Sequence, residues 1–135
     1  MLTKDIREIK DCTFTDCSDL NLSAKEISGC AFQGCSLTVI KSTSGVYVHN
    51  CNFIQCSFDA EEHNRGNGLI ELGTLRTVQD NEVSSCVFTD TEIINGYIIT
   101  SYLAKKRRCI PVTVRDNAFN LCRTNDRNKE FTHID

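Results

Sequence analysis

The sequence lacks the features of a membrane-spanning or exported protein. No apolar run approaches the roughly 20 residues that a membrane-spanning helix needs. The first twelve residues, MLTKDIREIKDC, have no apolar core of signal-peptide length. From these absences we expect a soluble, cytoplasmic chain.

Positive charge is not in excess either. The 135 residues carry 15 Lys and Arg against 18 Asp and Glu, which gives a net charge of -3. This balance argues against general electrostatic binding to nucleic acids or to anionic membranes. Apolar residues make up 40%, which is enough for a packed core. We therefore expect one folded domain spanning residues 1–135.

Histidine is scarce, and its three copies share no ligand spacing: His49, His63 and His133. The motif C-x4-C occurs three times, but a phenylalanine that needs burial interrupts each pair, unlike the tight cysteine turns of zinc sites. A Cys-His nucleophile would need an exposed, activated thiolate. We predict no metal, no cofactor and no enzymatic activity.

Cysteine, by contrast, is abundant, with nine in the chain. A disulfide framework normally uses an even number, and disulfide-rich chains are mostly shorter. Free cysteine is often buried and behaves as a small hydrophobic residue. We expect reduced cysteines in the core, which favours the cytosol. Cys109, outside the repeat described next, is the one candidate for a reactive thiol, with a packing role as the alternative.

A short motif recurs five times along the chain. We number it from position zero, which is occupied by Cys12, Cys30, Cys51, Cys86 and Asn117. Position +2 is always phenylalanine: Phe14, Phe32, Phe53, Phe88 and Phe119. Position +5 holds Cys17, Cys35, Cys56, Thr91 and Cys122, and position -3 holds Ile9, Ile27, Val48, Val83 and Val114. Position +7 is Leu37, Phe58 and Ile93 in the middle three copies.

The spacing predicts short strands that turn a corner. Positions 0 and +2 share parity, as do +5 and +7, so each pair faces one side of a strand. The step from +2 to +5 breaks parity, which requires a bend between them. Val, Ile, Phe and Thr dominate these runs, which disfavours a helix. We predict parallel strands about 4.8 Å apart, with an internal stack of phenylalanines beside stacks of cysteine. Asn117 fits position zero because stacked amides can form internal ladders.

The spacings between successive position-zero residues give coil lengths of 18, 21, 35 and 31. The longer coils are expected to carry excursions at 59–67 and 103–111, the second of which ends at the only proline, Pro111. The ends of a solenoid expose unpaired strand edges that need covering. We therefore assign residues 1–8 to an N-terminal cap, 9–123 to the coils and 124–135 to a C-terminal cap or tail.

Over residues 9–123 these features resemble right-handed parallel β-helix repeats. The resemblance is carried by C-x-F-x-x-C, by F-x-x-[NC], and by a glycine before apolar strands in SGVYV, NGLIEL and NGYIIT. This group includes the pectate-lyase-like solenoids and the F-x-x-N repeats of polymorphic outer-membrane proteins, whose Gly-Gly-Ala entry is lacking here. It implies an all-β, short right-handed parallel β-helix of about five coils. The alternative is the four-sided pentapeptide-repeat β-helix, because residues 20–39 and 81–100 read in fives, although the unequal coil lengths argue against it.

The outward positions beside the phenylalanines carry no carboxylate or base. They are Thr13, Thr15, Ala31, Gln33, Asn52, Ile54, Val87, Thr89, Ala118 and Asn120. The corner residues Asp16 and Asp90 are expected three repeats apart, or about 14 Å. This exceeds the roughly 5–9.5 Å that separates the carboxylates of glycosidases.

The stacked outer faces and loops predict a non-enzymatic protein-interaction module, an intracellular inhibitor or adaptor. The expected contacts are an outward row and a basic loop: Asn52, Ile54, Val87, Thr89, Lys105, Lys106, Arg107 and Arg108. A solvated loop, or contact with an acidic protein, explains KKRR better than nucleic acid does, because the rest of the domain is acidic. Two alternatives remain: a glycan-binding or glycan-processing fragment, by analogy of fold alone, and a structural oligomer that associates through the open solenoid ends.

Overall fold

The computed structural model describes residues 6–36, 38–41, 46–59, 68–72, 81–101 and 112–133. Within these ranges the chain is all β, with short strands in curled sheets and no helix. No segment of the described residues is therefore a helix that could cross a membrane. The predicted excursions at 59–67, apart from Asp59, and at 103–111 lie outside the described residues, as do the basic loop and Cys109.

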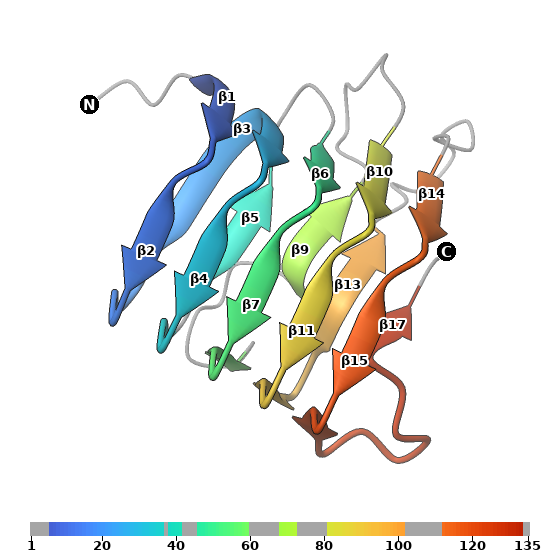
Figure 1. Cartoon of the computed structure of the whole chain (residues 1–135). Helices are drawn as coiled ribbons and strands as arrows, with labels where there is room; N and C mark the ends of the chain where they lie inside the picture. Colours follow the sequence, from blue (N-terminus) through green and yellow to red (C-terminus); the bar gives the residue numbers. More distant parts are fainter. Residues whose placement is uncertain are drawn as a thin grey trace.

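A five-stranded sheet carries the phenylalanine positions of the repeat (Figure 1). Its strands, in spatial order, are β2 (Thr13–Thr15), β4 (Ala31–Gln33), β7 (Asn52–Ile54), β11 (Val87–Thr89) and β15 (Ala118–Asn120). Neighbouring strands pair so that the five phenylalanines are direct partners from one repeat to the next. The register inferred from the motif is confirmed.

A curled nine-stranded sheet has one arm above the five-stranded sheet and one arm behind it in Figure 1. One arm holds β1 (Ile6–Lys10), β3 (Asn21–Ser28), β6 (Tyr47–His49), β10 (Asn81–Ser84) and β14 (Val112–Arg115). The other arm holds β5 (Val39–Lys41), β9 (Gly68–Leu72), β13 (Tyr97–Ser101) and β17 (Thr132–His133). Strand β3 joins the arms, because its beginning pairs with β5 and its end with β1 and β6.

A three-stranded sheet completes the fold, with β8 (Ser57–Asp59), β12 (Glu92–Ile94) and β16 (Arg123–Thr124). Every strand pairing in the described part of the chain is parallel. Parallel pairing between distant segments, in register at equivalent positions, is typical of a solenoid-like repeat fold.

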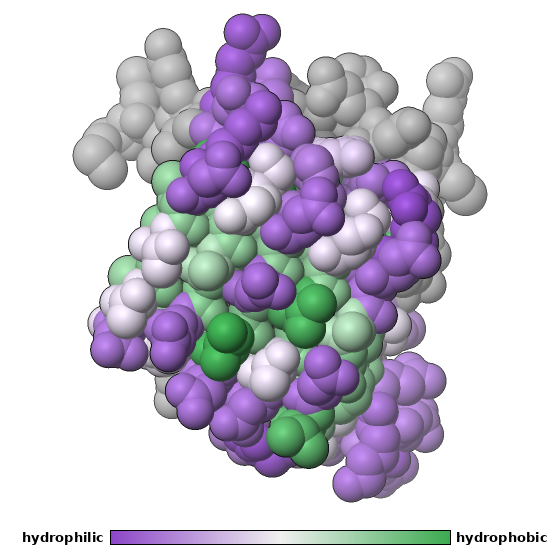
Figure 2. Space-filling model, in the orientation of Figure 1, coloured by the Kyte–Doolittle hydropathy of each residue, from purple (hydrophilic) through white to green (hydrophobic). Residues whose placement is uncertain are grey.

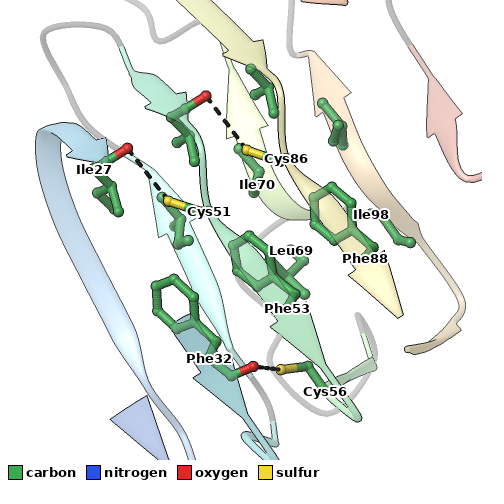
Figure 3. Packing of buried hydrophobic residues seen from close by; sticks show 14 of the residues in the cluster. Ile27, Phe32, Cys51, Phe53, Cys56, Leu69, Ile70, Cys86, Phe88 and Ile98 are labelled. Carbon is green, nitrogen blue, oxygen red and sulfur yellow. Dashed lines mark hydrogen bonds between the residues drawn. The ribbon is translucent and has the colours of Figure 1, made fainter. Parts of the chain in front are cut away.

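The predicted aromatic stack forms the centre of the core (Figure 3). Successive ring centroids from Phe14 to Phe119 are 4.9, 4.5, 4.7 and 5.2 Å apart, and neighbouring rings are within 10° of parallel. The three inner rings are fully buried, whereas Phe14 and Phe119 are half-buried because they lie at the two ends of the sheet. Leu69, Ile70 and Ile98 belong to the same buried cluster, on strands β9 and β13.

The bend after each phenylalanine is made by one residue in the left-handed backbone region. The residues at position +4 are Asp16, Gly34, Gln55, Asp90 and Leu121, with φ between 49° and 65°. A second bend precedes each position zero, at Asp11, Gly29, Asn50, Ser85 and Asp116. A left-handed residue changes the direction of the strand, so positions +2 and +5 both face inward despite their odd spacing. The predicted corner is confirmed.

The cysteines of the inner repeats lie in the core. Five are at most 2% exposed: Cys30, Cys35, Cys51, Cys56 and Cys86. All eight described cysteines are free. The inner thiols donate to carbonyl oxygens of their own and of the preceding repeat, as Cys51 does to His49 O at 3.4 Å and to Ile27 O at 3.6 Å (Figure 3). The prediction that the ladder buries its cysteines is wrong for Cys12, which is exposed because its repeat is the outermost one.

Asn117 replaces a cysteine at position zero by bonding to the backbone. Its Nδ2 donates to Val83 O at 3.0 Å, and its Oδ1 accepts from Cys86 N at 2.9 Å. The amide therefore bonds to two backbone groups of the preceding repeat. Asn117 is compatible with position zero, as expected, but its partners are backbone groups and not a stacked amide, because the four equivalent positions are cysteines.

Candidate functional site

The predicted outward row forms a compact block on the five-stranded sheet. Asn52 and Ile54 lie on β7 and are the direct partners of Val87 and Thr89 on β11. Ile54 is 37% exposed, as predicted. Val87, which was expected to be exposed, is half-buried, so the exposed apolar surface of the block comes mainly from Ile54. The other predicted contacts, Lys105 to Arg108, lie outside the described residues.

The whole outer face of this sheet is uncharged. All ten outward positions of the five strands hold Thr, Ala, Gln, Asn, Ile or Val. Leu121, at the corner after β15, adds a large apolar side chain that is 80% exposed. Figure 2 shows hydrophobic residues at the centre of this side of the molecule and hydrophilic residues around them.

Charged residues border this face along the corner that leads to the three-stranded sheet. Arg123 donates a hydrogen bond to the Asp90 carboxylate, and its Nε lies 3.7 Å from Glu92 Oε2. The hydrogen bond from Arg123 lowers the pKa of Asp90. The border is therefore ordered by ion pairs between neighbouring repeats.

A second outward face, on the β1–β14 arm of the nine-stranded sheet, gathers titratable side chains. At position -4, Glu26, Tyr47 and Glu82 are register partners on β3, β6 and β10. At position -2, Ser28, His49, Ser84 and Arg115 are partners on β3, β6, β10 and β14. The parallel register thus brings together residues that are far apart in the sequence.

These side chains form a continuous polar network around Tyr47. His49 Nε2 lies 3.1 Å from Glu26 Oε1, and the Tyr47 ring meets the His49 ring edge-on at 4.5 Å. The Ser84 hydroxyl donates to Glu82 Oε2 at 2.9 Å, which lowers the pKa of Glu82. The hydrogen bond to Glu82 in turn raises the pKa of Tyr47. Tyr47 remains 37% exposed at the centre of the network.

A shallow depression of about 580 Å³ lies at one edge of this network. Its lining includes Tyr47 and Glu26, together with Arg7, Glu8 and Lys25. An exposed aromatic ring beside carboxylates offers one apolar surface and several hydrogen-bond acceptors, which suits an extended polar ligand. No group of three or more His, Cys, Asp or Glu in the described ranges is arranged to hold a metal ion.

The sequence analysis missed this network because it weighed only the outward positions beside and after the phenylalanines. The signal was present in the motif. Position -3 is inward, so positions -4 and -2 must face outward by strand parity. Applied to each repeat, that rule would have selected Glu26, His49, Glu82 and Arg115.

Comparison of the chain with protein-family models, with curated proteins and with solved structures finds no match.

Proposed function

We propose that the chain is a short right-handed parallel β-helix of five coils and a non-enzymatic protein-interaction module, an inhibitor or adaptor that works inside the cell. Five in-register phenylalanines, each followed by a left-handed corner, support the five coils. Buried free thiols support a reducing compartment.

The uncharged outer face of the five-stranded sheet carries the proposal. Charged residues make up 24% of the chain, but none of these ten outward positions carries a charged residue. This depletion of charge is what a protein contact surface is expected to show. The cores of protein interfaces are depleted of charge, and their rims are polar. Exposed Ile54 and Leu121 provide the apolar contacts, and Asp90 and Arg123 belong to the rim.

The uncharged outer face of the five-stranded sheet forms a strip, and the dimensions of this strip indicate how much of an interface it supplies. Four strand spacings of about 4.8 Å and three residues of about 3.3 Å give a strip of roughly 19 by 10 Å. A standard interface buries about 800 Å² on each partner. The strip is therefore the centre of the contact, and the corner residues on both sides supply the remaining area.

The test uses tagged chains to capture partners from extracts of the native cell. Ile54→Glu/Val87→Glu places two charges in the strip, and we expect affinity for the captured partner to fall more than about tenfold because each charge must be desolvated. Thr113→Glu/Arg115→Glu, on exposed positions of β14, is the control and should retain the partner. Equal binding by both variants would refute the surface assignment.

A glycan ligand is the second candidate, and the network around Tyr47 favours it. An open depression with an exposed ring and carboxylates suits stacking and hydrogen bonding to sugar hydroxyls. A glycan array probed with the unmodified chain and with Tyr47→Ala tests this candidate. Signals that are absent, or unchanged by the substitution, would discard it.

A further inference from the structure

The two ends of the aromatic stack differ. At the C-terminal end the Phe131 ring covers Phe119, with centroids 5.5 Å apart, and β17 pairs with β13. The Phe131 carbonyl also accepts from Ile98 N at 2.7 Å. At the N-terminal end Phe14 stacks on Phe32 and, among the described residues, on no other ring. Within the described ranges, one end of the stack is covered by a further ring and the other is not.

Strand β2 presents an unpaired edge at the open end. In the inner repeats the residue at position +1 donates its N–H to the preceding repeat, as Ala31 N does to Cys12 O at 2.9 Å. The N–H and C=O of one strand residue point to the same side. Thr13 and Thr15 therefore direct four backbone groups away from β4, with no backbone partner in the part of the chain that the structure describes. Such an edge is a template for another strand.

The thiols next to this edge also have fewer partners than those further inside. Cys30 and Cys35 each reach a carbonyl of the preceding repeat as well as one of their own. In the part of the chain that the structure describes, the Cys12 and Cys17 thiols donate to carbonyls within their own repeat, to Lys10 O at 3.3 Å and to Thr15 O at 3.7 Å. A strand added at the edge would cover these thiols.

The sequence of the edge strand β2 indicates which partner strand suits it. Residues 13 to 15 read Thr-Phe-Thr, which is the same in both directions. A two-fold axis through Phe14 would pair the strand antiparallel with its own copy. Thr13 would then face Thr15 of the copy in hydrogen-bonded pairs, and the two Phe14 residues would meet in the closer, non-hydrogen-bonded pair. Threonine pairs and aromatic pairs at facing positions stabilise antiparallel strands.

We propose that the open edge of β2 is a homodimer interface, in which a second copy of this chain docks antiparallel to β2 about an axis through Phe14. The contact satisfies the four backbone groups of Thr13 and Thr15 on each chain and continues the aromatic stack across the axis. Because the two-fold contact uses the β2 edge of both chains, association closes at two copies. The interface uses the edge of β2 and not the central block of Asn52, Ile54, Val87 and Thr89, so it does not depend on the proposed function.

The first test compares two matched double substitutions by sedimentation velocity across a concentration series. Thr13→Lys/Thr15→Lys places lysines opposite each other in the dimer, and we expect dimer affinity to fall by at least about tenfold. Ala118→Lys/Asn120→Lys makes the same change at equivalent positions of the last repeat and should leave the affinity within about twofold. A monomeric unmodified chain at every concentration, or equal weakening in both variants, would overturn the proposal.

A second measurement does not depend on the variants folding. Equal amounts of isotope-labelled and unlabelled chain are mixed, and filtered NOEs between chains are recorded. Contacts between the Phe14 rings of two chains are expected. A dimer that shows intermolecular NOEs at other residues and none at Phe14 would refute this interface.

Discussion

Replacing Phe53 with leucine tests how much the aromatic stack contributes to stability. Phe53 is fully buried, with rings 4.5 and 4.7 Å away on its two sides. Each stacked contact stabilises by about 0.5–1.5 kcal/mol beyond its buried area, and an imperfect hydrophobic replacement costs up to about 1.5 kcal/mol more. The expected loss is about 2–4 kcal/mol, out of a typical domain stability of about 5–15 kcal/mol.

Phe131 provides the matched control. It has one stacked neighbour, at 5.5 Å, and is half-buried, so Phe131→Leu should cost about 1 kcal/mol or less. Urea unfolding followed by far-ultraviolet circular dichroism measures both variants. With a slope of about 2 kcal/mol per molar urea, the Phe53→Leu midpoint should fall by about 1–2 M. Equal shifts in the two variants would refute the idea that stacking along the repeat axis stabilises the fold.

Two further predictions concern the corners and the thiols. Gly34→Ala should destabilise by about 1–2 kcal/mol, because Gly34 has φ +65° and the added Cβ would collide with the Asp16 carboxylate. Thermal unfolding should show partial recovery in Asp16→Gly/Gly34→Ala, and no loss in the single variant would contradict this. Burial raises the pKa of the Cys56 thiol to about 11, so its alkylation should accelerate only as the pH rises toward that value. Cys56 should be alkylated more slowly than half-buried Cys122. Fast labelling of Cys56 at neutral pH, seen by peptide mass mapping, would contradict its burial.

The register and the corners were predictable because their signals are local and repeated. A phenylalanine two residues after each position zero predicts one inward row, and the odd step to position +5 predicts a bend. The identity of the bending residue was not predictable, because Asp16, Gln55 and Leu121 share no chemistry. What they share is a backbone conformation, imposed by the strands on either side.

The polar network around Tyr47 shows a different limit. Motif parity places Glu26, His49 and Glu82 on one outward face, but it does not give the hydrogen bonds and ring contacts that join them, which depend on side-chain conformation across neighbouring strands. The exposure of Val87 was also overestimated. Parity gives the face on which a side chain lies, but its exposed fraction depends on the size of the neighbours across adjacent strands.

The single-residue corners have a consequence for how such a chain can diversify. Each corner is made by one residue of its own repeat, and in the first four repeats the backbone N–H of that residue donates to the next repeat, as Asp16 N does to Gln33 O at 2.8 Å. The segment from position -3 to position +5 keeps its length in all five copies, whereas the intervals between copies range from 18 to 35 residues. Differences in length are therefore confined to the connecting segments, and a connecting segment can gain a recognition loop without any change in the strands and corners that carry it.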